Sequence, residues 1–325
     1  MVNLLANTDF LLPIQPLMDQ VEDLMQMQSR GHHSELGAAL DHLLSSGGKR
    51  IRPALSLLTG SMLGANTSRM ITLAASIELL HTATLVHDDL IDGSLLRRGI
   101  PTLNAQWTPA ATVLTGDFIF ARAAGLAAET RSVDVERLFA ETLSSIVNGE
   151  ITQMFGSRGL ANREDYYRRI QAKTASLFEL ATSAAAMLSP VHKNAQAAVR
   201  RYGHVIGMAF QIVDDVLDFS GDQVTVGKPL ASDLRQGLIT LPALYYIESH
   251  PDDVDMREIL DGNRYNEERL NRVIAAIRAS SAIEQSMQEA RQFVEEGLTA
   301  LSDQPQGVEH QALEDLAHYI VRRQS

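Results

Sequence analysis

Apolar residues recur at helical spacing along most of this 325-residue chain. In residues 68–92, Ile71, Ala74 and Ile77 fall on one helix face, and Ser68 is available as the N-cap. The same pattern extends over residues 134–156, 164–188, 194–219, 240–249 and 266–299. The chain has only 10 Pro and few hairpin-type turn pairs, so β-hairpins are not expected. The spacing predicts an all-α protein.

Several of the predicted helices are apolar around most of their circumference. A helix of this kind has to be covered on all sides, so it belongs to a large core. A chain of this length can bury such a core. We therefore expect one domain over residues 1–325 rather than two small ones.

The composition excludes several classes of protein. The chain has no Cys, which excludes disulfides, thiolate zinc sites and a Cys nucleophile. Its formal net charge of −12 argues against nucleic-acid binding. No apolar run approaches the roughly 20 residues of a membrane span. The first basic residue is Arg30, so no signal or transit peptide is expected, and the protein is predicted to be cytoplasmic.

Two acidic clusters share the pattern Asp-Asp-x-x-Asp. They consist of Asp88, Asp89 and Asp92, and of Asp214, Asp215 and Asp218. On a helix, the first and last aspartates of each cluster lie one turn apart on one face, and the middle one flanks them. Both clusters sit in apolar segments, where two like charges about 4 Å apart repel by roughly 4 kcal/mol at an effective dielectric constant of about 20. Each cluster therefore requires protonation, basic partners or a metal.

A solvated or salt-bridged patch is the simpler interpretation of a single cluster. Two copies, both in apolar helices, favour metal binding. Carboxylates without soft ligands suit Mg²⁺, which usually completes its shell with water and substrate phosphates. The sequence therefore predicts a cleft where two acidic helices face each other and hold a phosphorylated ligand through Mg²⁺.

Basic residues lie near the predicted helix ends, where they could bind phosphate. The run Gly47-Gly48-Lys49-Arg50-Ile51-Arg52-Pro53 places three cations after a pair of glycines, and it is not a P-loop. The other basic motifs are Arg97-Arg98-Gly99, Lys173-Thr174 and Gly227-Lys228-Pro229. Each of them alone is also compatible with an exposed loop or a structural role.

Taken in order, these motifs resemble those of the trans-isoprenyl diphosphate (polyprenyl) synthases of the medium- or long-chain type. The resemblance runs from Gly47 to Pro242, with a similar-looking C-terminal end at residues 318–323. It implies an antiparallel helix bundle of the isoprenoid-synthase kind around a deep central cavity, usually as a homodimer. It also implies a prenyltransferase that joins isopentenyl diphosphate head to tail to an allylic diphosphate and releases diphosphate.

The resemblance also implies roles for individual residues. The six aspartates, together with Lys173, would be catalytic, with about three Mg²⁺ held on the allylic diphosphate by the aspartates. The allylic diphosphate would be bound by Arg97, Lys173, Thr174, Gln211 and Lys228. Isopentenyl diphosphate would be bound by Gly48, Lys49, Arg52, His81 and Arg98. The leaving diphosphate is the expected base, so no protein nucleophile is needed.

One position departs from the family pattern. The family often has a lysine five residues after the aspartate of the loop that follows the second cluster, whereas Leu238 stands at that distance from Asp233. One diphosphate contact is then missing, or Arg235 replaces it. Turnover should survive, with weaker affinity for the allylic substrate.

Product length in this family is limited by the residues before the first cluster, because the growing tail runs down that helix. Ala83 and Thr84 stand five and four residues before Asp88, and both are small. Five residues span about 7.5 Å of helix. We therefore expect a C30–C50 product from farnesyl or geranylgeranyl diphosphate, although small residues also serve helix packing. A lower floor of the cavity could involve Ile146, Val147 or Phe155.

Rival functions stay open at this point. A terpene cyclase or a head-to-head synthase shares the metal chemistry, but a cyclase would not need Lys49 and Arg52 for a second diphosphate. A non-catalytic partner subunit usually lacks the acidic clusters, whereas this chain keeps all six aspartates. Within the family, a geranylgeranyl (C20) diphosphate synthase is the alternative.

Overall fold

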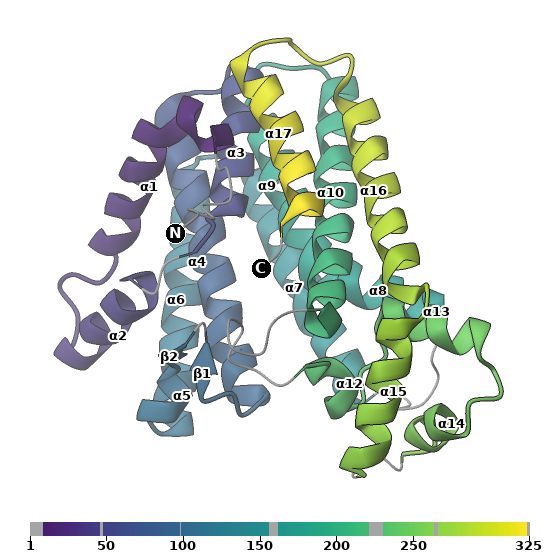
Figure 1. Ribbon diagram of the computed structural model, residues 1–325. Coiled ribbons are helices and arrows are strands. Elements are labelled where there is room, and N and C mark those ends of the chain that lie inside the picture. Colours follow the sequence, from purple (N-terminus) through teal and green to yellow (C-terminus); the bar gives the residue numbers. More distant parts are fainter. Residues whose placement is uncertain are drawn as a thin grey trace, which may run out of the picture. The chain divides into compact units, whose positions relative to one another are not determined.

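The computed structural model describes residues 9–45, 48–97, 99–155, 162–220, 230–262 and 266–323. Helices form almost all of the regular structure in these residues, and the exception is one pair of two-residue strands (Figure 1). The predicted all-α class is confirmed.

The chain divides into two compact units, each assembled from separate segments. The first unit comprises the residues up to Leu143 together with Leu177–Gly203 and Ala300–Leu316. Its elements are η1 (Asp9–Ile14), α1 (Gln15–Met27), α2 (Ser34–Ser45), α3 (Ile51–Met62), α4 (Thr67–Ile91), β1 (Leu96–Arg97), β2 (Ile100–Pro101), α5 (Leu103–Gln106), α6 (Pro109–Glu129) and nearly all of α9 (Ser176–Met187).

The second unit comprises Ser144–Ser176, His204–Thr299 and the residues from Ala317 onward. Its elements are α8 (Arg163–Ile170), a π-helical segment (Gln171–Ala175), α12 (Ser232–Gln236), α13 (Leu241–Ser249), α14 (Val254–Leu260), α15 (Glu267–Ala279) and nearly all of α16 (Ala282–Leu301). Both units receive residues from α7 (Val133–Phe155), α10 (Lys193–Ser220) and α17 (Val308–Arg322). The single domain over residues 1–325 stays a prediction.

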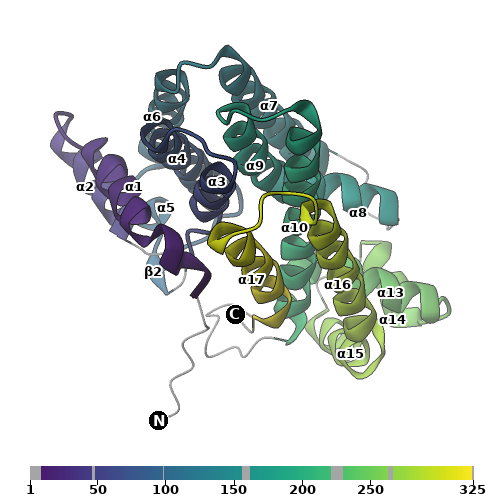
Figure 2. The ribbon, with the colours of Figure 1, turned by 90° about the horizontal axis from the view of Figure 1, so that it is seen from above.

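Helix α4 forms the core of the first unit. The Asn66 side chain caps it by accepting a hydrogen bond from the Arg69 N–H at 3.1 Å, so the cap is not Ser68 as the sequence suggested. Leu73, Ile77 and Leu80 are fully buried. Helices α1, α3 and α6 pack against α4, and Figure 2 shows it beside α3 and α6. This burial explains why α4 is apolar around most of its circumference.

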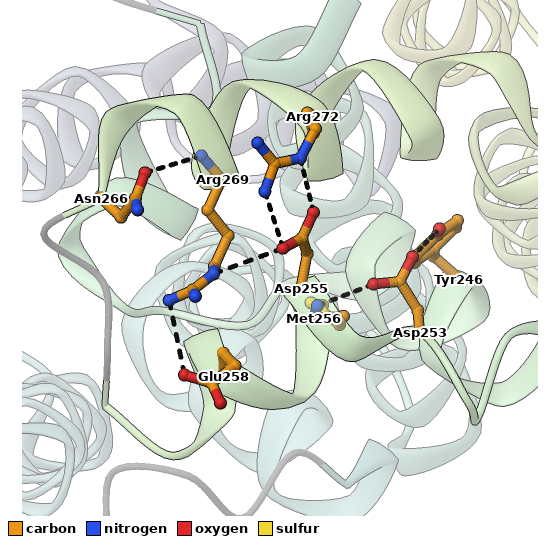
Figure 3. Close-up of polar contacts among 8 residues, drawn as sticks. All are labelled: Tyr246, Asp253, Asp255, Met256, Glu258, Asn266, Arg269 and Arg272. Carbon is orange, nitrogen blue, oxygen red and sulfur yellow. Dashed lines mark hydrogen bonds and ion pairs between the residues drawn. The ribbon is translucent and has the colours of Figure 1, made fainter.

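The core of the second unit forms around the end of α10. Phe219, the last but one residue of that helix, is fully buried in a cluster with Leu234, Tyr246 and Ile277. In the same unit, Asp255 of α14 joins that helix to α15, because its carboxylate pairs with Arg269 and Arg272 (Figure 3). The apolar cluster therefore anchors the helix turn that carries the second acidic motif.

The structure corrects three details of the predicted elements. Residues 266–299 are not one helix, because α15 ends at Ala279 and the Ser280 hydroxyl accepts a hydrogen bond from the Ala282 N–H that starts α16. Residues 164–188 are helical, but the π segment interrupts them. A small hairpin does form, with Leu96 opposite Pro101 and Arg97 opposite Ile100.

Two described helices, α4 and α6, are long and apolar enough to cross a membrane by length and composition alone. The expectation that no stretch reaches this length is therefore wrong by that criterion. Within the qualifying stretch, 67% of α4 and 39% of α6 is buried inside the protein. Buried core helices of soluble proteins pass the same test, so these two helices are weak evidence for a span.

Candidate active site

The first acidic cluster lies at the end of α4 in the first unit. Asp88 and Asp89 belong to its last turn, and Asp92 is its C-cap, whose N–H donates to the Asp88 carbonyl at 2.8 Å. Asp92 is exposed and Asp88 is half-buried, whereas Asp89 is only 7% exposed. The helix therefore leaves the outer pair accessible and turns the middle aspartate inward.

The inward Asp89 is paired with Arg97, which the β1–β2 hairpin brings back to the end of α4. The Arg97 Nε lies 3.0 Å from both carboxylate oxygens, and Nη2 lies 2.8 Å from Oδ1. A forked, charge-assisted contact of this kind fixes the orientation of both groups. The Arg97 side chain remains 38% exposed, so it can also contact an anion. The neighbouring candidate Arg98 lies outside the described residues.

A close approach between α4 and α6 fixes the position of the first cluster. A Cβ on Gly116 of α6 would clash with the ring of His87, the residue before Asp88. The His87 Nε2 lies 3.3 Å from the Val113 carbonyl oxygen and 3.6 Å from Asp117 Oδ1. Gly116 therefore allows the His87 ring to rest directly on α6, one residue from the cluster.

The three cations of the Gly-Gly-Lys-Arg-Ile-Arg-Pro run have different surroundings. Arg50 lies before α3 with a left-handed φ of 46°, and its guanidinium bonds Glu78 of α4 at 2.8 Å and the Leu44 carbonyl at 3.0 Å. Arg50 is therefore a structural link. Lys49 and Arg52 are half-buried, and the Arg52 guanidinium lies 5.0 Å from the centre of the Phe178 ring. The glycine candidate, Gly48, is exposed.

The remaining candidates of the first unit lie on α4. His81 is half-buried two turns before Asp88. Ala83 is fully buried, whereas Thr84 is half-buried and donates its hydroxyl hydrogen to the His81 carbonyl at 2.7 Å. The two proposed chain-length residues therefore differ in their surroundings.

The second acidic cluster lies in the last turns of α10 and repeats the burial pattern of the first. Asp214 and Asp218 are half-buried, whereas Asp215 is only 3% exposed. Asp214 pairs with Arg323 near the C-terminus at 2.6 Å. The Asp218 Oδ1 accepts hydrogen bonds from the N–H and the hydroxyl of Ser232, at 3.0 and 2.8 Å.

The middle aspartate, Asp215, has two polar partners of its own. The Tyr166 hydroxyl donates to Oδ2 at 2.7 Å, and the Gln211 Nε2 donates to Oδ1 at 2.8 Å. Burial, with the charge of Asp233 nearby, raises the pKa of Asp215 to about 8, although both hydrogen bonds act to lower it. Burial likewise raises the pKa of Tyr166 above its ordinary value, so the phenol stays a donor.

The Lys173-Thr174 motif falls inside the π segment. The Lys173 Nζ pairs with Glu150 of α7 at 2.7 Å, and the Thr174 hydroxyl donates to Gln211 Oε1 at 2.6 Å. A Cβ on Gly149 would clash with the Cβ of Ala172, so this glycine lets α7 approach the π segment. Single-turn π insertions often occur at functional sites. The fifth allylic candidate, Lys228, lies outside the described residues.

The structure disfavours Arg235 as a replacement for the missing lysine. Its guanidinium bonds the Leu230 carbonyl, Glu267 and Asn271, at 2.9, 2.5 and 2.7 Å. These contacts hold Arg235 on α15. Leu238 therefore leaves the position without a cation.

Both acidic clusters have the donor chemistry of a hard divalent cation. Their ligands are carboxylate oxygens, and in each cluster the accessible pair is one turn apart. No three His, Asp or Glu residues in the described part of the chain come close enough to form a metal site by themselves. A cation bound here would take further ligands from water and substrate phosphates, which is usual for Mg²⁺.

Sequence reasoning missed several partners of the second cluster, among them Tyr166 and Arg323. Tyr166 lies 49 residues before Asp215, and a buried tyrosine in a helix gives no local sign of its partner. Arg323 belongs to the similar-looking C-terminal end, but the sequence did not connect it with Asp214. Its Nη2 also bonds the Phe210 carbonyl at 2.7 Å.

Comparison with known proteins adds independent findings. The family model described as "Polyprenyl synthetase" matches residues 33–277. The heptaprenyl diphosphate synthase component 2 of Geobacillus stearothermophilus is 36% identical over 304 residues, covering 93% of this chain and 94% of the relative. The octaprenyl diphosphate synthase of Haemophilus influenzae is 34% identical over 313 residues, covering 95% and 94%. The solved structure of a polyprenyl synthase from Caulobacter crescentus, complexed with calcium and isoprenyl diphosphate, has a TM-score of 0.92 and 35% identity and covers 98% of each chain.

These findings and the two aspartate-bearing helix ends define an enzyme, a prenyltransferase with the isoprenoid-synthase fold. The chain belongs to the polyprenyl synthetase family. The resemblance inferred from the motifs is thereby confirmed.

Proposed function

We propose that this prenyltransferase uses Mg²⁺ to elongate farnesyl or geranylgeranyl diphosphate with isopentenyl diphosphate, giving an all-trans C30–C50 polyprenyl diphosphate. The observation that carries the proposal is the shared burial pattern of the two clusters. Each cluster keeps its outer aspartates accessible and satisfies its middle aspartate from within the protein. The named heptaprenyl and octaprenyl relatives support the range of product lengths.

The chain's own residues have distinct tasks in this reaction. Asp88, Asp92, Asp214 and Asp218 would hold the metal, with Asp89 and Asp215 supporting them from inside. Bound Mg²⁺ supplies Lewis-acid stabilisation of the negative charge on the leaving diphosphate. Arg97, Lys173, Thr174, Gln211 and Lys228 would bind the allylic diphosphate.

The second diphosphate requires a separate set of groups. Gly48, Lys49, Arg52, His81 and Arg98 would bind isopentenyl diphosphate. The allylic carbon–oxygen bond breaks, a carbon–carbon bond forms to isopentenyl diphosphate, and the released diphosphate takes up the proton that is lost. Fixed cations placed where the charge develops lower the barrier of such a step.

We further propose a cytoplasmic homodimer. Helix α7 exposes an apolar stripe at helical spacing, formed by Val147, Ile151, Met154 and Phe155. An exposed stripe of this kind is typical of a surface that another chain covers. The name "component 2" of the Geobacillus relative makes a different partner subunit the alternative.

The test is to incubate the purified chain with radiolabelled isopentenyl diphosphate and each of geranyl, farnesyl and geranylgeranyl diphosphate, with Mg²⁺ or EDTA. We expect Mg²⁺-dependent products of 30 to 50 carbons, sized by chromatography, from the two longer primers. Products ending at C20 would contradict the proposed length. A hydrocarbon formed without isopentenyl diphosphate would indicate a cyclase. Failure of the chain to turn over alone would indicate a required partner subunit. Light scattering reports the oligomeric state separately.

A further inference from the structure

The second unit contains a buried polar link to a tyrosine that has no role in the proposed reaction. Tyr166 on α8 is 2% exposed, and its hydroxyl donates to Asp215 on α10, which is 3% exposed. The Arg169 guanidinium lies 5.6 Å from the centre of the Tyr166 ring. A phenylalanine would fill the same space, so the hydroxyl is what distinguishes tyrosine here.

The link continues through the other oxygen of the same carboxylate. Gln211 donates to Asp215 Oδ1 at 2.8 Å, and it accepts from the Thr174 hydroxyl at 2.6 Å. Gln211 and Asp215 are one helical turn apart on α10. Tyr166 precedes the π segment and Thr174 lies within it, so α8 and the π segment are both fastened to the same face of α10.

The π segment requires stabilising contacts of this kind. A π turn inserts an extra residue into the hydrogen-bond ladder and is rare, so its register depends on the contacts around it. This segment carries Lys173, whose ammonium is paired with Glu150. A shift of its register would move Lys173 and Thr174 together.

We propose that Tyr166 is a positioning residue, which acts through Asp215 to hold the accessible pair Asp214 and Asp218 and the π segment with Lys173 in the geometry that binds a metal-complexed diphosphate. The inference rests on the proposed function of this site. It assigns to Asp215 the role of a brace between helices, because both of its carboxylate oxygens are engaged by protein donors.

The test compares Tyr166→Phe with a matched control, Tyr246→Phe. The Tyr246 hydroxyl donates to the Asp253 carboxylate at 2.6 Å in the same unit, and Asp253 caps α14 (Figure 3). The two substitutions therefore remove the same chemical contact, but only one of these contacts involves the acidic cluster. Calorimetric titration with inorganic diphosphate in the presence of Mg²⁺ measures binding without turnover. Steady-state kinetics measure kcat and the KM of each substrate, and thermal melts report folding.

We expect Tyr166→Phe to weaken Mg²⁺-dependent diphosphate binding and to lower kcat by about ten- to hundred-fold, the effect of leaving a buried carboxyl oxygen without its hydrogen-bond donor. The KM for isopentenyl diphosphate should stay within about two-fold, and Tyr246→Phe should change neither parameter. In an Asp215→Asn background, Tyr166→Phe should have much less additional effect, because the two residues act as one unit.

Three results would overturn the inference. These are wild-type binding and turnover by Tyr166→Phe, equal losses in both tyrosine variants, and fully additive losses with Asp215→Asn. Failure of the proposed function is distinguishable, because the wild-type protein itself would then bind no Mg²⁺–diphosphate.

Discussion

Thr84→Phe should shorten the product of this enzyme. Thr84 precedes Asp88 by four residues, which places it about 6 Å along α4 from the metal-bearing turn and about 40° from Asp88 around the helix. Its side chain is half-buried, so a larger ring can project from the helix without entering the core. An aromatic ring this close to the reacting end should stop the tail after one or two additions, at C20 or C25.

The structure also predicts the stability cost. The Thr84 hydroxyl bonds the local His81 carbonyl, so its loss should change the free energy of unfolding by less than about 0.5 kcal/mol. Ala83→Phe addresses the same question less cleanly. Ala83 is fully buried, and overpacking should cost about 1–3 kcal/mol there.

A matched control lies on the same helix. Thr72 is half-buried and donates its hydroxyl hydrogen to the Ser68 carbonyl at 3.1 Å, as Thr84 does to His81. It lies about 24 Å along α4 from Asp88 and about 160° around it. Thr72→Phe should therefore leave the product unchanged.

The assay extracts the products made from radiolabelled isopentenyl diphosphate and farnesyl diphosphate, removes the diphosphate and sizes the alcohols by reverse-phase chromatography. Urea unfolding of each variant accompanies it. An unchanged product from Thr84→Phe, or equal shortening by Thr72→Phe, would refute the idea that the tail runs along this face of α4.

Further predictions concern the acidic clusters. Arg97→Lys should lower kcat/KM about ten-fold, because lysine cannot form the forked contact with Asp89; wild-type kinetics would contradict this role. In EDTA, the metal-free protein should lose stability as pH rises between 4 and 8, because folded Asp215, with its pKa near 8, keeps a proton that the unfolded chain releases. The free energy of unfolding should fall by at most about 1.4 kcal/mol per pH unit, and this slope should be absent in Asp215→Asn. Urea unfolding at pH 5.5, 6.5 and 7.5 measures the slope. Parallel pH profiles of the wild type and Asp215→Asn would contradict the prediction. Asp92→Asn should raise the Mg²⁺ concentration that gives the half-maximal rate. Asp303→Asn, which changes an exposed aspartate, is the control and should raise it less. Equal Mg²⁺ dependence of the two variants would exclude Asp92 as a ligand.

Helical spacing predicted most of this fold because long helices form their own backbone hydrogen bonds, and their apolar residues recur at a clear helical period. It did not predict the break at Ser280, because the apolar period continues across it from α15 into α16. It also could not predict the π segment, whose sequence has the composition of an ordinary helix. A two-residue strand such as β1 is too short to show an alternating pattern.

The candidate site was likewise predictable from the sequence only in part. The i, i+4 spacing predicted which aspartates share a face, since that follows from helix geometry alone. The partners of the middle aspartates depend on tertiary contacts. Arg97 reaches Asp89 across the short connection between α4 and β1, whereas Tyr166 reaches Asp215 from another helix. No local pattern encodes the second kind of contact.

The most direct test of the central claim is a crystal structure of the enzyme with Mn²⁺ and an unreactive thiolo analogue of farnesyl diphosphate, in which anomalous scattering locates the metal ions. We predict metal peaks at the carboxylates of Asp88 and Asp92 and at those of Asp214 and Asp218, all on the oxygens of one diphosphate. Metal bound elsewhere, or a diphosphate held through one acidic cluster alone, would contradict the claim that both clusters act on the same leaving group.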